Sequence, residues 1–366
     1  MIRLLQIVTL ALVVGGCSST GPSPTVVEPE SRTTAAATTE IAAEATTTAA
    51  DLAPDAFFQP WGNAALEIGE LGWEDAFIGP GALVHANGEY HLFYLAVGNE
   101  QLGSTVGHAA TSRLEDGFFR RADVPLFTVA DAGYLDNGPS VKSALVTADG
   151  IWMLFFNTTG LNGRGSSGLI GRATAPAPEG PWTVDPAPAL VPGEEGTWDD
   201  LSVRDPYVIA TSDGYRMYYS GDSGDADARP DRQIGLATSA DGETWDRSAD
   251  PVFQLGAEEA WDGLRVFEPV VIPVSDGYVM FYGSSRHYED ERTRTFMYGY
   301  AVSDDGLTWE RPISAPLFTS GDNYSIFGGR VVHEGDDWYL VYGQQRMLGR
   351  PSEVQVAIWR GPLPTD

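Results

Sequence analysis

The sequence contains a single cysteine among 366 residues, Cys17, so the chain can form no intramolecular disulfide bond. A chain of this length with 43% apolar residues can bury a sizeable hydrophobic core without covalent cross-links. The folded part must therefore be held together by its own packing.

Basic residues are also scarce, because 22 Lys and Arg stand against 51 Asp and Glu, a formal net charge of −29. A chain of this charge repels a phosphate backbone, which argues against nucleic acid as a partner. The acidic residues are scattered along the predicted turns. We interpret them as a solvated surface and not as a binding face.

The N-terminal part lacks the features of a folded domain. Residues 17–54 contain no aromatic residue and are rich in Thr, Ala, Pro, Ser and Glu, a composition that predicts a disordered tether. Residues 1–16 form an apolar run with one Arg, too short to span a bilayer and typical of a secretory signal. The folded domain is predicted over residues 55–366.

The signal ends in Val14-Gly15-Gly16-Cys17, which resembles a bacterial lipobox. The resemblance implies cleavage before Cys17, lipidation of that cysteine and an extracytoplasmic, membrane-anchored protein. The alternative is a generic secretory signal followed by an incidental cysteine.

A repeat of about 62 residues organises the rest of the chain. Each copy contains an apolar strand core and then a second strand, separated by turns such as Asp-Gly and Asn-Gly. The cores begin at Tyr90, Ile151, Tyr215, Tyr278 and Trp338. Self-similarity at this period predicts an all-β fold, a five-bladed β-propeller of four-stranded antiparallel blades.

The outer strand of the fifth blade is missing from the repeat, since only four such strands lie between cores. Residues 65–69, ALEIG, match the outer-strand pattern and precede the first core. We therefore predict that residues 65–69 pair with the strand at 354–359 and close the ring. Such closure removes an open sheet edge that would template aggregation.

Candidate site residues lie where the innermost strands begin, because those strands line the channel of a propeller. We counted ten residues back from each core and applied a one-residue shift in the first blade. The positions obtained are Gly79, Val141, Asp205, Glu268 and Gly328. The two acids precede prolines on adjacent blades, which predicts a paired-carboxylate site; alternatively, they cap backbone N–H groups.

With these motifs the sequence resembles the five-bladed glycosidases of glycoside hydrolase families 43, 32 and 68 and the phosphorylases of family 130. The resemblance covers roughly residues 56–361. It implies that Glu268 is the general acid and that Asp205 tunes this acid or holds the sugar. Proximity of two carboxylates would also raise the pKa of one of them, as a general acid requires.

The chain departs from the family at the first blade, where Gly79 replaces the carboxylate of an Asp-Pro. Hydrolysis needs two carboxylates about the scissile bond. Asp75, or Asp136 on the second blade, could supply the missing group from a loop. Each could equally be an exposed loop acid.

Three further residues are candidates for substrate binding. Arg330 lies two residues beyond Gly328 and is expected on the channel face, where a guanidinium suits a carboxylate or a pair of sugar hydroxyls. His287 could reach the rim. Arg204 neighbours Asp205 but is expected on the opposite side of its strand.

Three functions are compatible with these residues. The first is a glycosidase that hydrolyses O-glycosyl bonds of an oligo- or polysaccharide. The second is a non-catalytic saccharide-binding propeller that has lost its base. The third, a phosphorylase, needs clustered basic residues, whereas its candidates Lys142, Arg265, Arg286 and Arg330 are scattered in the sequence. We expect a monomer that uses no cofactor and no metal ion.

Overall fold

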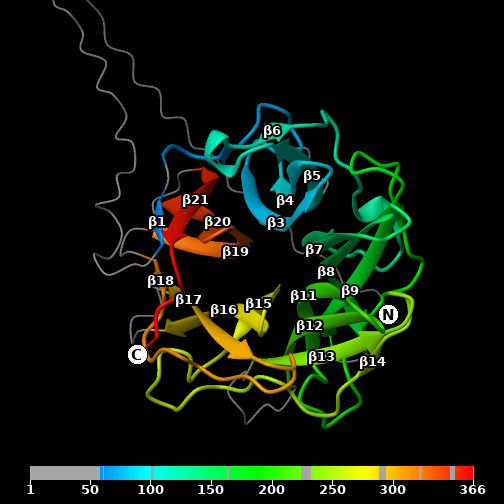
Figure 1. The fold of residues 1–366 in the computed structure, drawn as a ribbon. Helices are drawn as coiled ribbons and strands as arrows, with labels where there is room; N and C mark the ends of the chain where they lie inside the picture. The colour runs from blue at the N-terminus through cyan, green and yellow to red at the C-terminus, as the bar shows by residue number, and fades with distance from the viewer. Residues whose placement is uncertain are drawn as a thin grey trace, which may run out of the picture. The chain divides into compact units, whose positions relative to one another are not determined.

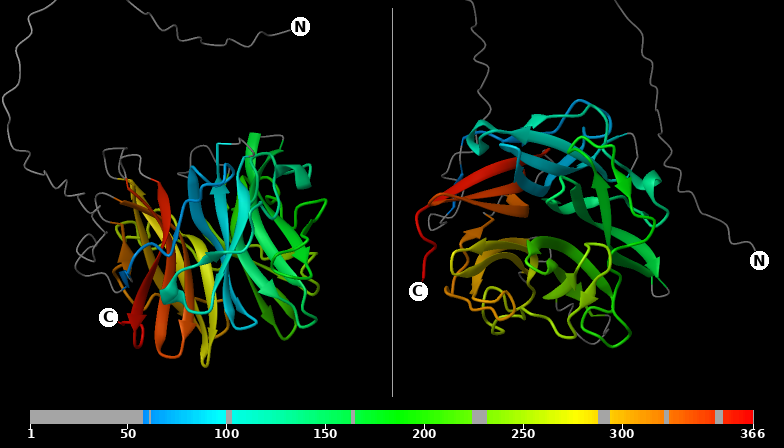
Figure 2. Two further views of the ribbon diagram at one scale, coloured as in Figure 1. Left: turned by 90° about the horizontal axis from the view of Figure 1, so that it is seen from above. Right: turned by 45° about the vertical axis from the view of Figure 1, so that its right-hand side comes forward.

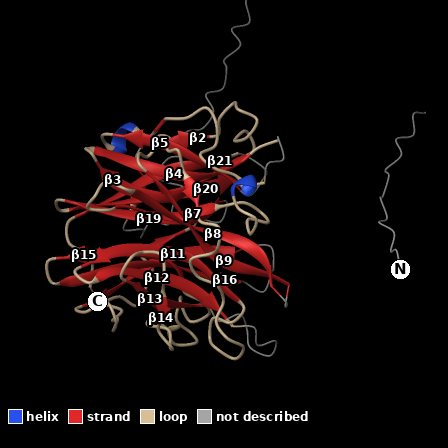
Figure 3. Ribbon diagram, turned by 90° about the vertical axis from the view of Figure 1, so that its right-hand side faces the viewer, coloured by secondary structure: helices blue, strands red, loops and turns tan. Residues whose placement is uncertain are grey.

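The computed structural model of this protein describes residues 58–60, 62–99, 103–162, 165–223, 232–287, 294–320, 324–346 and 351–365. The predicted signal, the tether and the lipidation site Cys17 lie outside the described residues. In the part of the chain that the structure does describe, no helix is long and apolar enough to cross a membrane. Figure 3 shows strands throughout and only short helical turns.

Five antiparallel sheets are arranged as a five-bladed propeller, which confirms the predicted fold (Figure 1). Blade 1 contains β3 (Phe77–Ala86), β4 (Glu89–Val97), β5 (Thr105–Thr111) and β6 (Phe119–Arg120). Blade 2 contains β7 (Ser140–Val146), β8 (Trp152–Asn162), β9 (Gly165–Ala175) and β10 (Thr183–Val184). Blade 3 contains β11 (Ser202–Thr211), β12 (Gly214–Asp222), β13 (Gln233–Ser239) and β14 (Asp246–Arg247).

Blade 4 contains β15 (Phe267–Val274), β16 (Gly277–His287), β17 (Arg294–Ser303) and β18 (Phe318–Thr319). Blade 5 contains β19 (Tyr324–Glu334), β20 (Asp337–Arg346) and β21 (Ser352–Arg360), joined by β1 (Gln59–Pro60) and β2 (Leu66–Glu67). The innermost strands β3, β7, β11, β15 and β19 surround the centre in Figure 1, and Figure 2 shows the blades from two further sides.

The second strand of each blade is buried on both faces, because neighbouring blades pack face to face. In β12, Met217, Tyr218 and Tyr219 are fully buried, although they are successive residues that point to opposite faces. Met217 and Tyr219 belong to the core shared with blade 2, and Tyr218 to the core shared with blade 4. This two-sided burial explains why the strand cores are continuous apolar runs and not alternating ones.

The N-terminal segment closes the ring as predicted. Leu66 of β2 lies opposite Val354 of β21, and the N–H of Ala65 donates to the carbonyl oxygen of Val354 at 2.7 Å. The structure adds a second pairing that we did not predict, between β1 and the later part of β21. Phe58, directly before β1, is 1% exposed and packs in the core of blades 4 and 5.

Each innermost strand contains a β-bulge at the same height. The regular pairing with the second strand is interrupted at Gly81, at Lys142, at Asp205-Pro206, at Glu268-Pro269 and at Gly328-Gly329. A bulge bends the strand and redirects a side chain. The candidate acids therefore lie where the strands depart from regular geometry.

Candidate active site

Asp205 and Glu268 are held in the same strained backbone conformation. Each has φ of 53°, and the other non-glycine residue with positive φ in the described part is Asn87, which precedes a glycine in a two-residue hairpin turn. Such a conformation costs about 1–3 kcal/mol outside turns, and a residue before proline is further biased toward extended geometry. The surroundings must impose this conformation on both acids.

Two side chains from the preceding blades hold the strained residues. Asn157 of blade 2 accepts from the Asp205 N–H at 2.6 Å and donates through Nδ2 to Asp205 Oδ1 at 2.9 Å. Ser220 of blade 3 accepts from the Glu268 N–H through its hydroxyl at 3.2 Å. Each acid is thus fixed from the neighbouring blade, so the pair depends on the assembled ring.

Lys142 of blade 2 bridges the two acids. Its Nζ lies 3.0 Å from Glu268 Oε1 and 3.5 Å from Asp205 Oδ1. The three side chains are 7–13% exposed, so the ion pairs are largely shielded from solvent. Sequence reasoning led us to expect two acids that repel each other, but the structure places an ammonium group between them.

From the sequence we named Lys142 only among the scattered basic residues considered for a phosphorylase. We did not place it beside the acids because the hairpin of blade 2 is longer than the others. Val146 pairs with Trp152 across five residues, whereas Thr211 and Gly214 of blade 3 are separated by two. The core of blade 2 therefore starts at Trp152 and not at Ile151, and the position counted as Val141 belongs to Lys142. This correction would have revealed the lysine from the sequence.

Asp205 is an ionised carboxylate in this setting. Burial alone would raise its pKa, but the charges of Lys142, Arg232 and Arg204 and the hydrogen bond from Asn157 outweigh burial and lower the pKa to about 2. The charge of Asp205 is consequently balanced by cations from blades 2 and 3. It is available at neutral pH to accept a hydrogen bond or to stabilise positive charge.

Arg204 and Arg232 meet at Asp222 beside the acids. Arg232 Nε lies 3.0 Å from Asp222 Oδ1, and Arg204 Nε lies 3.6 Å from Asp222 Oδ2. Arg204 also donates to the Ser202 hydroxyl, and its side chain is 34% exposed. The predicted binding residue Arg204 therefore lies at the rim, close enough for its charge to lower the pKa of Asp205.

In the first blade the strand register corrects our choice of Gly79. Pro80 pairs with Tyr94, so Pro80 is the counterpart of Asp205, and blade 1 still has no carboxylate there. A Cβ atom on Gly79 would lie 2.8 Å from a ring carbon of Phe327. Phe327 stacks on Phe77 with centroids 5.4 Å apart, so aromatic rings leave no room for a side chain at Gly79 itself.

The two loop acids have different surroundings. Asp75 accepts hydrogen bonds from the backbone and side-chain nitrogens of Asn99 at 2.9 and 3.0 Å, and these bonds lower its pKa. Asp136 is exposed. Their role as water-positioning groups stays a prediction.

Arg330 contributes to the closure of the ring. Its guanidinium is 3% exposed and donates to the carbonyl oxygens of Gly81 in blade 1 and Gly329 in its own strand. These contacts are to the backbone, so the predicted contact with a sugar would need its remaining N–H groups. The side chain of His287, the third predicted binding residue, lies outside the described residues.

Glu268 has a further partner that we did not predict, Tyr298 of β17. The Tyr298 hydroxyl donates to Glu268 Oε2 at 3.2 Å and accepts from the N–H of Gly329 at 3.0 Å. The corresponding positions in the other repeats hold Val106, Ile170, Ile234 and Val354. A polar aromatic residue at an otherwise aliphatic repeat position was the sequence signal for this contact.

The acids, Lys142, Asn157 and Tyr298 together form a polar cluster that can bind saccharide hydroxyls and exchange protons. Among the described residues, no group of three or more His, Cys, Asp or Glu side chains is arranged to hold a metal ion.

No family model matches the sequence. Two curated relatives are "Uncharacterized protein Rv1502" of Mycobacterium tuberculosis (strain ATCC 25618 / H37Rv) and "Uncharacterized protein MT1551" of Mycobacterium tuberculosis (strain CDC 1551 / Oshkosh). Each is 29% identical over 178 residues, which cover 47% of this chain. The match spans 59% of the length of each relative, less than two thirds.

Solved structures resemble the propeller in fold. One is a complex of BT0996 with RGII, with a TM-score of 0.65, 19% identity and coverage of 86% of this protein and 94% of that structure. A thermostable family-43 glycoside hydrolase has a TM-score of 0.58 and 18% identity, with 82% and 98% covered. A structure from a study of family 130 mannoside phosphorylases and hydrolases has a TM-score of 0.56 and 19% identity, with 84% and 97% covered.

Proposed function

We propose that this protein is a glycoside hydrolase that acts on an oligo- or polysaccharide, with Glu268 as the proton donor. The observation that carries the proposal is the pair of strained carboxylates, Asp205 and Glu268, held on adjacent blades and bridged by Lys142. Strain of this kind persists where the surroundings enforce it, and it is concentrated at functional sites. The glycoside hydrolases among the fold neighbours support a saccharide as the ligand.

In the proposed reaction, a proton moves from Glu268 to the glycosidic oxygen as the bond from that oxygen to the anomeric carbon breaks. Asp205, which is ionised, accepts a sugar hydroxyl and stabilises the positive charge that develops on the ring. Water then attacks the anomeric carbon and gives its proton to a base. Positioned proton donors contribute about 10²–10⁴-fold to such reactions.

If the enzyme inverts, we expect its base to come from outside the Asp205 and Glu268 pair. Both carboxylates contact the same Lys142 nitrogen, at 3.5 and 3.0 Å, so their nearest oxygens are separated by no more than the sum of these distances. Inverting enzymes hold their carboxyl groups about 6.5–9.5 Å apart to leave room for water. Asp75 and Asp136 are our candidates for the group that positions this water.

A second candidate function is saccharide binding without turnover. The observation in its favour is that blade 1 has Pro80, and no carboxylate, at the counterpart of Asp205. In this alternative the acids and Lys142 bind sugar hydroxyls, and no bond is broken.

The leaving group of the substrate tests the role of Glu268. Glu268→Gln should slow hydrolysis of saccharides and of alkyl glycosides by about 10²–10⁴-fold. It should leave dinitrophenyl glycosides much less affected, because that leaving group needs no proton. Glu89→Gln, which changes an exposed acid paired with Arg121, is the control. Assays with and without inorganic phosphate separate a hydrolase from a phosphorylase.

If Glu268→Gln slows the hydrolysis of alkyl glycosides and dinitrophenyl glycosides by the same factor, proton donation by Glu268 is contradicted. If the unaltered protein binds saccharides but turns over none of a broad panel, the binding function replaces the hydrolase.

We further propose that the protein is extracytoplasmic and held at the membrane by lipid on Cys17. Cys17→Ser should move the folded protein from the membrane fraction to the soluble fraction. Retention of the variant in the membrane pellet would contradict the proposed anchor.

A further inference from the structure

Tyr298 is the only described partner of one of the two Glu268 oxygens, and the direction of its hydrogen bond is fixed. The Gly329 N–H donates to the Tyr298 oxygen at 3.0 Å, so that oxygen already acts as an acceptor. The single phenol hydrogen is left for Glu268 Oε2, 3.2 Å away. If Oε2 carried a proton, both this O–H group and the Gly329 N–H would donate to the Tyr298 oxygen. The phenol hydrogen of Tyr298 would then have no acceptor.

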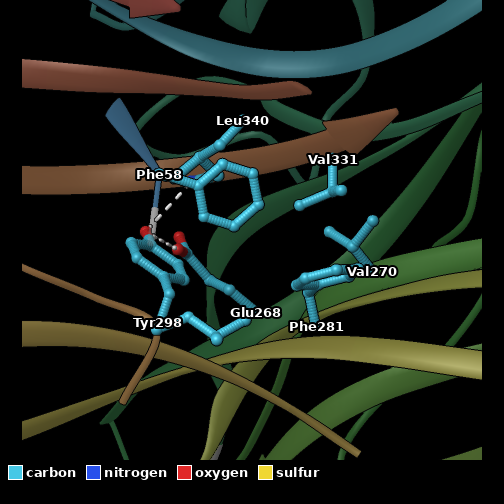
Figure 4. Close-up of a pocket in the computed structure, with 9 residues that line it drawn as sticks. Phe58, Glu268, Val270, Phe281, Tyr298, Val331 and Leu340 are labelled. Atoms are coloured by element: carbon cyan, nitrogen blue, oxygen red, sulfur yellow. Dashed lines mark hydrogen bonds between the residues drawn. The ribbon is translucent and has the colours of Figure 1, made fainter. Parts of the chain in front are cut away.

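The surroundings of this hydrogen bond exclude other partners. Figure 4 shows Glu268 and Tyr298 beside a cavity lined by apolar side chains from blades 4 and 5 and by Phe58 of the N-terminal segment. The cavity has room for about one water molecule and offers that molecule few polar partners. A Glu268 oxygen that points toward the cavity therefore has Tyr298 as its hydrogen-bond partner, and a partial rotation of the carboxyl group would break this bond without a replacement in the cavity.

Gly329 is the residue that permits this arrangement. A Cβ atom at position 329 would lie 2.9 Å from ring carbons of Tyr298, closer than a side chain can approach. Gly328-Gly329 occupies the bulge that holds Asp205-Pro206 and Glu268-Pro269 in the neighbouring blades. At the bulge position where blades 3 and 4 carry acids, blade 5 thus provides the Gly329 N–H, which orients Tyr298.

We propose that Tyr298 is a positioning residue that reserves Glu268 Oε1 as the oxygen that gives and regains the proton. Oε1 lies on the side of Lys142, toward Asp205, whereas Oε2 lies against the apolar cavity. When the proton leaves Oε1, the carboxylate that remains is stabilised by a charge-assisted bond from Tyr298. The inference rests on the proposed role of Glu268 in proton transfer.

The charged and titratable groups that face Glu268 come from three strands and from the residue that precedes a fourth. Lys142 on β7 and Tyr298 on β17 contact it directly, Asp205 lies on β11 across Lys142, and the charge of Arg232, directly before β13, lies within electrostatic range. Burial and the nearby Glu268 charge raise the pKa of Tyr298 well above that of a free phenol. Tyr298 therefore remains a donor throughout the working range of pH.

The test reads the Glu268 carboxyl group without requiring turnover. In protein labelled with ¹³C at the glutamate carboxyl carbons, the Glu268 signal is assigned by its loss in Glu268→Gln. A hydrogen bond to the ionised form lowers a pKa, so Tyr298→Phe should move the titration midpoint of Glu268 to higher pH. Gly329→Ala, which displaces the phenol, should move the midpoint in the same direction.

Tyr282→Phe is the matched control, because Tyr282 is a buried tyrosine of the same blade that donates to a different acid, Asp262, at 2.8 Å. It should leave the Glu268 midpoint unchanged. An unchanged midpoint in both Tyr298→Phe and Gly329→Ala would overturn the inference. If the midpoint moves but the unaltered protein hydrolyses no glycoside, Tyr298 positions Glu268 in a binding site, and only the hydrolase proposal is lost.

Where turnover is measurable, the alkaline limb of the pH profile of kcat/KM provides a second readout. This limb should move to higher pH in Tyr298→Phe by the same amount as the NMR midpoint. If kcat/KM falls in Tyr298→Phe but the alkaline limb of its pH profile stays at the same pH, the role of Tyr298 is structural.

Discussion

Asp262 and Glu268 lie close together in the sequence of blade 4, and each accepts a hydrogen bond from a tyrosine, yet their surroundings differ. Asp262, in the loop before β15, is 1% exposed and binds the Tyr282 hydroxyl at 2.8 Å and Arg311 Nε at 2.6 Å, all within blade 4 or its outer connection. Glu268 binds a cation from blade 2 and has a strained backbone.

The Asp262 arrangement is repeated in two other blades. Asp199 binds the Tyr219 hydroxyl and Arg247, and Glu74 binds the Tyr94 hydroxyl and Arg120. In each case the arginine lies in or beside the outer strand of the blade. Its ion pair connects this strand to the loop that precedes the innermost strand, where the acid lies. Recurrence with partners from the same blade indicates a structural lock.

The difference provides a criterion that separates the structural acids from the two acids to which we assign a function. A lock acid is paired with a tyrosine and an arginine of its own blade in ordinary backbone geometry, so removing a partner should reduce stability only. Asp205 and Glu268 are held at φ of 53° by side chains of other blades and share one ammonium group. Substitutions there should affect function more than stability.

The largest loss of stability is expected when the arginine of a structural lock is replaced. Arg311→Met should lower the free energy of unfolding by about 3–5 kcal/mol, because the buried Asp262 carboxylate would keep no cation. Chemical denaturation measures the loss, and turnover per folded molecule should not change. Arg113→Met is the control: its partner Glu115 lies 3.9 Å away and Arg113 is 68% exposed, so the expected change is within about 0.5 kcal/mol.

A smaller loss of stability is expected at low pH, where Asp205 becomes protonated. The pKa of Asp205 is about 2 in the folded protein and near its ordinary value of 3.8 in the unfolded chain. The stability that this difference provides, about 2–3 kcal/mol, is present above pH 4 and is lost as the pH falls through 2. Asp205→Asn should flatten the pH dependence of unfolding between pH 4 and 2. Parallel curves for the two proteins would contradict this.

The smallest effect on stability is expected at the exposed loop acid. Asp136→Asn should leave the free energy of unfolding within about 0.5 kcal/mol of the unaltered protein. If Asp136 positions the attacking water, turnover should nevertheless fall, whereas Asp75→Asn should spare turnover. The opposite outcome would assign that role to Asp75, and unchanged turnover in both variants would remove both candidates.

Much of the fold could be predicted because the repeat is carried by continuous apolar cores and by turns of regular length. Closure by residues 65–69 could be predicted because four outer strands had to serve five blades. The pairing of β1 could not, since two residues, Gln59 and Pro60, carry no strand pattern. Its position depends on Phe58, which packs against residues distant in the sequence.

The site could be predicted from the sequence only in blades whose hairpins and bulges have the same lengths, because counting residues back from each core assumes one strand register for all blades. Asp205 and Glu268 were found because blades 3 and 4 have hairpins of the same length and the same two-residue bulge. Lys142 was not placed beside the acids because blade 2 has a longer hairpin. Gly79 was chosen over Pro80 because we shifted the count by one residue for the Asn87-Gly88 turn, although this turn has two residues like that of blade 3. Tyr298 reaches the site from the third strand, which the count did not include.

The central claim, that Glu268 serves function while Asp262 serves the fold, is tested most directly by comparing two isosteric variants. Glu268→Gln and Asp262→Asn are each measured for glycoside turnover and for the midpoint of thermal unfolding. We predict that Glu268→Gln loses about 10²–10⁴-fold in turnover at nearly unchanged midpoint, and that Asp262→Asn keeps its turnover but unfolds at lower temperature. A Glu268→Gln variant that is destabilised like Asp262→Asn, with undiminished turnover, would contradict the account.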